Sequence, residues 1–155
     1  MIYNVKNRPK VYLLHGNMSS KEIAALYQEK SVKCILSPTR GEGYGLPLID
    51  AAAIGMPIVA TNWSGHLEFL GDKNNFNSID YEMIEINKSR CDGEIFLQGQ
   101  KWAEPKEKSF KDQLSNVYND YEEVTKKAKI LSESVISNFN HKKIKNMYDN
   151  IFSLL

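Results

Sequence analysis

The sequence has few cysteines, almost no net charge and no long apolar run, and each absence argues against a class of protein. Only two of its 155 residues are cysteine, which argues against a disulfide scaffold. Twenty basic residues nearly cancel nineteen acidic ones, and no basic stretch is interleaved with aromatics, so nucleic acid is not an expected partner. No segment approaches the roughly 20 apolar residues that span a bilayer, and Met1–Lys10 lacks the apolar core of a signal peptide. The sequence therefore predicts a cytoplasmic protein.

Length and composition predict a single globular domain over residues 1–155. Hydrophobic residues make up 42% of the chain and charged residues 25%, which is ordinary for a soluble globular protein. Cys34 lies in the apolar run Val32–Leu36, where a thiol behaves as a small buried hydrophobe. No internal repeat or low-complexity linker divides the sequence.

Strand and helix patterns alternate over the first 61 residues. Short apolar runs predict three strands, at Val11–Leu14, Lys33–Leu36 and Pro57–Thr61. A capping box of Ser19 and Glu22 predicts a helix over roughly residues 20–30. A second helix, Leu46–Ile54, opens with Pro47 and ends at Gly55. Such βαβ units require a parallel sheet with helices on its faces, so the predicted class is α/β.

Beyond residue 70 the pattern is weaker and then becomes helical. Ile79–Ile86 and Glu94–Leu97 are predicted as short strands. From about Lys108 apolar residues recur at helical spacing, which predicts two helices and a terminal helix over Ile144–Leu154. The apolar stripes of the first two helices are Phe110, Leu114, Val117 and Tyr121, and Ile130, Leu131, Val135 and Ile136.

A glycine-rich loop stands between the strand that ends near Leu36 and the helix that begins at Leu46. Gly41, Gly43 and Gly45 permit positive φ angles and let a ligand come close to the main chain. The first N–H groups of a helix lack partners within it, so a diphosphate can bind to them and to the positive end of the helix dipole. Because Pro47 has no N–H, we expect the donors to be Tyr44, Gly45 and Leu46.

Two carboxylates flank this loop. Glu42 precedes the helix and Asp50 lies about one turn inside it, so both can face one cleft. Carboxylates repel a phosphate but accept hydrogen bonds from sugar hydroxyls, which predicts that one binds a hexose and the other a ribose. The position agrees with the rule that open α/β sheets bind ligands beyond the carboxyl ends of their strands.

Residues 37–70 resemble the donor-binding region of family 4 GT-B glycosyltransferases, the glycosyl transferases group 1. The hallmark of that family is two glutamates separated by seven residues, and the corresponding pair here is Glu42 and Asp50. The resemblance also takes in Thr61–Leu70 and Gly99–Pro105, and it reaches upstream to His15–Ser19, near the base pocket of the family.

The resemblance implies a Rossmann-like donor domain that binds a nucleotide diphosphate sugar and transfers its hexose with anomeric retention. It implies that Glu42, in the catalytic position, contacts the transferred sugar and that Asp50 contacts the ribose. The diphosphate would lie on the amides of Gly43, Tyr44, Gly45 and Leu46, with Met18 near the base and Arg40 as the nearest cation.

The sequence departs from the family in two respects. Asp50 is one methylene shorter than the usual glutamate, so its contact with the ribose can pass through water. The acceptor domain, and the earlier part of the donor domain with its basic residues, have no counterpart. We therefore expect a fragment or one half of a split enzyme that is catalytically incomplete alone. The alternative is a non-catalytic nucleotide-sugar-binding module that pairs with a separate acceptor domain.

No metal or cofactor is expected, since the sequence contains no H-x-x-E, C-x-x-C or D-x-D motif. Amides, the helix dipole and basic side chains would then stabilise the leaving diphosphate. His15 and His66 are interpreted as structural or surface residues, and Trp63 and Trp102 as core or cleft-wall aromatics. One set of lysines is interpreted as solvated helix faces, with peripheral contact to anionic lipid as the alternative: Lys126, Lys127, Lys129, Lys142, Lys143 and Lys145.

Overall fold

A three-stranded parallel sheet forms the centre of the molecule. The computed structural model describes residues 9–154, and the sheet contains β1 (Ile35–Ser37), β2 (Ile58–Thr61) and β3 (Asn77–Ile79) in the order β1-β2-β3. Both pairings are parallel, with Ile35 opposite Ile58 and Thr61 opposite Ile79. The predicted α/β class and parallel sheet are therefore confirmed.

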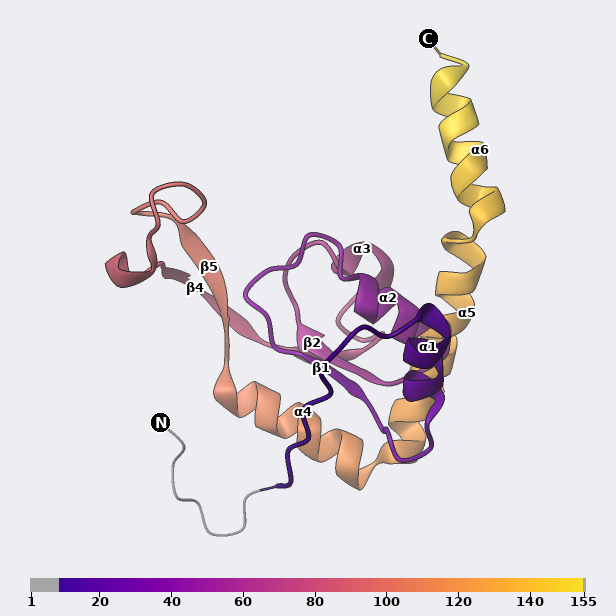
Figure 1. The fold of residues 1–155 in the computed structure, drawn as a ribbon, viewed down its shortest axis with the longest axis horizontal. Coiled ribbons are helices and arrows are strands. Elements are labelled where there is room, and N and C mark those ends of the chain that lie inside the picture. Colours follow the sequence, from indigo (N-terminus) through magenta and orange to yellow (C-terminus); the bar gives the residue numbers. More distant parts are fainter. Residues whose placement is uncertain (1–8, 155) are drawn as a thin grey trace.

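Helices surround this sheet, and a separate hairpin projects from it (Figure 1). The hairpin pairs β4 (Tyr81–Glu85) with β5 (Lys101–Pro105) in antiparallel fashion, and the 3₁₀-helix η1 (Lys88–Arg90) lies in its connection. The helices are α1 (Ser20–Gln28), α2 (Leu46–Ala53), α3 (Leu67–Leu70), α4 (Glu107–Asn119), α5 (Tyr121–Asn138) and α6 (His141–Phe152).

Two apolar clusters hold the layers together because β2 is buried on both faces. Ile58 and Ala60 belong to the larger cluster, with residues of α2, α3 and α5. Val59, between them in the sequence, belongs to a second cluster with Val117 of α4 and Val124 of α5. Alternate residues of β2 therefore pack against helical residues on opposite faces of the sheet.

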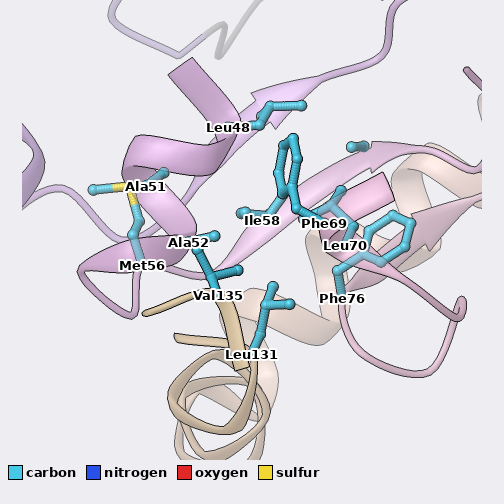
Figure 2. Close-up of a cluster of buried hydrophobic side chains, with 11 residues drawn as sticks. Leu48, Ala51, Ala52, Met56, Ile58, Phe69, Leu70, Phe76, Leu131 and Val135 are labelled. Atoms are coloured by element: carbon cyan, nitrogen blue, oxygen red, sulfur yellow. The ribbon is translucent and has the colours of Figure 1, made fainter. Parts of the chain in front are cut away.

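The larger cluster fixes the helix that follows the glycine loop. Ala51 and Ala52 of α2 are fully buried in the same cluster as Leu131 and Val135 of α5, and Ala52 lies beside Val135 (Figure 2). Small side chains allow the two helices to approach closely, and Ser132 Oγ of α5 donates a hydrogen bond to Ala53 O at 2.7 Å. The position of α2 is thus set by the core.

The predicted capping box is present at the start of α1. The Glu22 amide donates to Ser19 Oγ at 3.3 Å, and the Ser19 amide donates to Glu22 Oε2 at 2.7 Å. The Ser19 amide, and then the Ser19 hydroxyl, donate to the Glu22 carboxylate and hold its pKa below the ordinary value. The second helix also begins at Leu46, as predicted, and ends one residue early, at Ala53.

The predicted strand at Val11–Leu14 is wrong. The segment is irregular, and Val11 and Leu13 are each 87% exposed. An apolar run is buried as a strand only where neighbouring strands and helices cover it, and β1 forms that edge of the sheet in the part of the chain that the structure describes. The third parallel strand is instead Asn77–Ile79, which the sequence pattern missed.

The predicted strand at Glu94–Leu97 is also wrong. Asp92 Oδ1 accepts hydrogen bonds from the amides of Glu94, Ile95 and Phe96, each at 2.9 Å. These local bonds form a turn and occupy the N–H groups that a strand ladder would need. The predicted strand Ile79–Ile86 is divided, because β3 ends at Ile79 and β4 begins at Tyr81.

The predicted helical C-terminus is confirmed, with errors in its apolar faces. Tyr121, predicted on the stripe of the first helix, is exposed and begins α5, because α4 ends at Asn119. Leu131 and Val135 of α5 are buried, but Ile130 and Ile136 are 67% and 57% exposed, because α5 buries a narrower stripe than the sequence suggests. The last helix, α6, extends away from the sheet (Figure 1) and begins earlier than predicted, at His141. Among residues 9–154, no helix combines the length and apolar character needed to cross a membrane.

Candidate functional site

The glycine loop lies at the carboxyl end of β1 and leads into α2, as predicted. Gly45 is the N-cap of α2, is buried, and has a φ of 83°. A Cβ at this position would lie 3.1 Å from His66 Cβ, so both conformation and space require glycine. Gly41 and Gly43 do not have positive φ, so the predicted conformation is wrong for these two, while the close approach of a ligand to their main chain stays a prediction.

The loop presents a group of unpaired backbone donors. The amides of Gly43, Tyr44, Gly45 and Leu46 find no acceptor within residues 9–154. Pro47 has no N–H, and Gly45 O accepts the amides of Leu48 at 2.9 Å and Ile49 at 3.1 Å. The amides therefore stand at the anchored N-terminus of a helix, which is an arrangement that binds anions.

A second loop, which follows β2, holds the backbone of Glu42. Ser64 Oγ accepts a hydrogen bond from Glu42 N at 2.9 Å and donates one to Glu42 O at 2.7 Å. The Gly65 amide also donates to Glu42 O, at 3.1 Å. The half-buried Glu42 is thus held in place by a segment that follows a different strand.

The two loops touch at Gly65. A Cβ on Gly65 would lie 2.0 Å from Gly43 O and 2.8 Å from Gly43 C, so only glycine fits there. Ser64 and Gly65 lie within the segment Thr61–Leu70 that resembles the family, but their residue types predict no role in the site. The glycine itself was the available signal, since a glycine after a buried strand often marks a close backbone approach.

Asp50 lies on α2 and faces α1. A cleft of about 380 Å³ between these helices is lined by Asp50 and, from α1, by Ser20, Ile23 and Tyr27. Burial raises the pKa of Tyr27, and the nearby Asp50 carboxylate adds to the increase. Met18 is 40% exposed and just precedes α1. The cleft is therefore mostly apolar, and among residues 9–154 Asp50 is the one carboxylate that lines it.

Arg40 contacts the β4–β5 hairpin. Its Nη2 donates to Glu104 Oε1 at 2.8 Å, its Nε donates to Glu104 Oε2, and its guanidinium lies 4.4 Å from the centre of the Trp102 ring. The hydrogen bonds lower the pKa of Glu104 and raise that of Arg40. Both side chains are substantially exposed, so solvent screens the pair, but its two parallel hydrogen bonds and the contact with Trp102 hold the guanidinium toward the hairpin.

The histidine and tryptophan side chains near the loops make packing contacts and hydrogen bonds within the fold. His66 is fully buried, and its Nε2 lies 2.7 Å from Thr61 O, to which it donates. Trp63 is 39% exposed and packs on Tyr81, with ring centres 5.3 Å apart, while Trp102 is half-buried. In residues 9–154 no three or more His, Cys, Asp or Glu side chains are grouped so as to hold a metal ion.

Comparison with known proteins gives one match. A family model described as "Glycosyl transferases group 1" matches residues 1–85, which is more than half of the 155 residues. The matched range includes both loops and excludes β5 and helices α4 to α6. No curated protein and no solved structure matches the chain.

Proposed function

Because this chain belongs to the glycosyl transferases group 1 family, we propose that it is the donor-binding domain of a hexosyltransferase that acts with anomeric retention. The observation that carries the proposal is the row of unpaired amides from Gly43 to Leu46, at the N-terminus of α2 and beyond the carboxyl end of β1. A nucleotide diphosphate has the charge and the oxygen acceptors that such a site binds.

Each part of the donor is assigned to a part of the site. The diphosphate lies on the amides of Gly43 to Leu46, and Glu42 accepts hydrogen bonds from hydroxyls of the transferred hexose. Asp50 accepts hydrogen bonds from the ribose in the cleft between α1 and α2, which leads towards Met18 and the base. The location of Asp50 on the α1 side of α2 supports this orientation of the nucleotide. Arg40 is the cation assigned to the diphosphate, and it would reach the diphosphate by leaving its pair with Glu104.

Transfer by this domain requires no metal. The amides and the helix dipole stabilise the negative charge that develops on the leaving diphosphate, because they are fixed before the reaction and point at it. Glu42 holds the hexose so that its anomeric carbon faces the incoming acceptor.

The acceptor site is supplied from outside these 155 residues, by an N-terminal part or by a separate chain. Residues 1–155 form one nucleotide-sugar-binding domain that is catalytically incomplete alone. The second candidate function is a non-catalytic module that binds the same donor and pairs with a separate acceptor domain. Both candidates bind the donor at the same site. They differ in whether the hexose is transferred when an acceptor domain is supplied.

Contact of the basic helix faces with anionic lipid stays a prediction. Lys126 pairs with Glu122 and Glu123 on α5, and Lys145 pairs with Asp149 on α6, so some of this charge is already balanced.

We expect titration calorimetry of the whole chain with UDP and with GDP to give heat for one of the two nucleotides. Binding should be weak, because Arg40, the cation assigned to the diphosphate, is paired with Glu104, and binding should not require magnesium. Uridine and guanosine are the controls, and they should bind more weakly because they offer no diphosphate to the helix N-terminus. No heat from either nucleotide at millimolar concentration would refute the donor site, and strict dependence on magnesium would refute the metal-free mechanism.

A further inference from the structure

We propose that Ser64 is a positioning residue, which holds the backbone of Glu42 so that the Glu42 carboxylate meets the donor hexose. The inference rests on the proposed function, since it concerns the sugar end of the same site. Ser64 itself touches no part of the donor in this account and acts only through Glu42.

The hydroxyl of Ser64 serves both main-chain polar groups of one residue. It accepts from Glu42 N at 2.9 Å and donates to Glu42 O at 2.7 Å, and the Gly65 amide donates a further hydrogen bond to the same carbonyl. With its N–H and C=O both bound to the second loop, the peptide of Glu42 has little freedom to turn. The direction in which the Cα–Cβ bond of Glu42 points is therefore set by the segment after β2.

The backbone of Ser64 is strained, which indicates that the hydroxyl compensates for an unfavourable conformation. Its φ is 97°, and it is the only residue other than glycine with a positive φ in the part of the chain that the structure describes. Residues that have a Cβ rarely adopt a positive φ. A glycine would fit it without strain, but a glycine has no hydroxyl to bind Glu42.

The Ser64 bonds act on Glu42 rather than on the diphosphate amides. Gly45 and Leu46 are anchored separately, because Gly45 O accepts the amides of Leu48 and Ile49 and α2 is packed in the core. Loss of the Ser64 hydroxyl should therefore loosen the sugar end of the site and leave the diphosphate end intact.

The test compares Ser64→Ala with Ser64→Gly by titration calorimetry of the whole chain, using UDP and UDP-glucose, and GDP and GDP-mannose. Both variants should lose about threefold to tenfold in affinity for the nucleotide sugar, the effect of one or two net hydrogen bonds, with affinity for the bare nucleotide nearly unchanged. Ser64→Gly should melt at a higher temperature than Ser64→Ala, because glycine relieves the positive φ.

Ser109→Ala is the matched control, because the half-buried Ser109 hydroxyl of α4 also binds a main-chain group far away in sequence, accepting from Asp80 N at 2.9 Å. It should lower the melting temperature and leave both affinities unchanged. If Ser64→Gly binds the nucleotide sugar as tightly as the wild type, or if the losses in affinity follow the melting temperatures, Ser64 has a structural role only and the proposal is wrong.

Amide hydrogen exchange tests the positioning role of Ser64 independently of whether a donor binds at the site. The Glu42 N–H should exchange faster in both Ser64 variants than in the wild type, and this readout needs no ligand. Unchanged exchange at Glu42 overturns the positioning role even where the nucleotide binds. Faster exchange in a protein that binds neither nucleotide nor nucleotide sugar overturns the proposed function, and the positioning role toward a donor sugar fails with it.

Discussion

Glu42→Gln is expected to weaken binding of the nucleotide sugar tenfold or more while leaving binding of the bare nucleoside diphosphate almost unchanged. Loss of a charged hydrogen-bond acceptor costs about 1.5–3 kcal/mol, and glutamine keeps the size of the side chain. The two main-chain bonds to Ser64 do not involve the carboxylate, so the loop should retain its conformation. Titration calorimetry with both ligands measures the difference.

Asp50→Asn provides the contrast, since it should weaken both ligands, which both carry the ribose. Asp50→Glu adds the methylene that the family has and should tighten both, because the cleft of about 380 Å³ beside Asp50 has room for it. Equal losses for the two ligands in Glu42→Gln would contradict its assignment to the hexose. If neither Glu42→Gln nor Asp50→Asn weakened either ligand, both carboxylates would lie outside the site.

Gly65→Ala is expected to destabilise the fold and abolish most donor binding. The new Cβ would meet Gly43 O at 2.0 Å and Gly43 C at 2.8 Å, and these backbone atoms cannot turn away as a side chain would. Overpacking of this kind costs typically about 1–3 kcal/mol, and here the strain is relieved only by separating the two loops. The bare nucleotide and the nucleotide sugar should both bind more weakly, because the Gly43 peptide belongs to the proposed diphosphate site.

Gly43→Ala is the matched control on the other side of this contact. A Cβ on Gly43 meets no atom within 4 Å, and the residue has no positive φ, so the substitution should change the free energy of unfolding very little. Urea unfolding monitored by tryptophan fluorescence compares the two variants. Equal stability of Gly65→Ala and Gly43→Ala would show that the loops are not in close contact in solution.

The parts of the fold that were predicted correctly are those determined by local signals. Ser19 and Glu22 form their capping box within four residues, and Pro47 and Gly55 mark the ends of α2 by backbone chemistry alone. The apolar run that contains β2 is buried on both faces, so it appears in the sequence as an unbroken series of apolar residues. The parallel sheet then follows from the lengths of the connections.

The errors arise where the outcome depends on neighbours. Val11–Leu14 has the composition of a buried strand but lies beside no strand in the described chain, whereas Asn77–Ile79 begins with two polar residues and is a strand because β2 pairs with it. Asn77 is tolerated there because its side chain donates to Ile58 O at 3.2 Å. By hydrophobic pattern alone, Val11–Leu14 is the better candidate for a strand and Asn77–Ile79 the poorer one, which is the reverse of what the structure shows.

The glycine loop of the candidate site could be predicted from the sequence, but its contact with the loop after β2 could not. Gly41, Gly43 and Gly45 are close in sequence, and together with Glu42 they indicate a ligand site by their residue types and spacing alone. The bonds between Ser64 and Glu42 join segments 22 residues apart, and only the parallel pairing of β1 with β2 brings them together. Arg40 illustrates the same limit, because its partner Glu104 lies on a hairpin 64 residues away.

The most direct test of the donor site is the amide NMR spectrum of the ¹⁵N-labelled chain during titration with UDP or GDP. If the diphosphate binds at the N-terminus of α2, the amide signals of Gly43, Tyr44, Gly45 and Leu46 should move furthest and saturate together, because their N–H groups acquire a charged acceptor. The polar cleft of about 450 Å³ lined by Lys73, Asn116 and Lys127 is the internal comparison, and its amides should not move. Shifts confined to that cleft, with the signals from Gly43 to Leu46 unchanged at saturating nucleotide, would contradict the assignment of this domain's donor site.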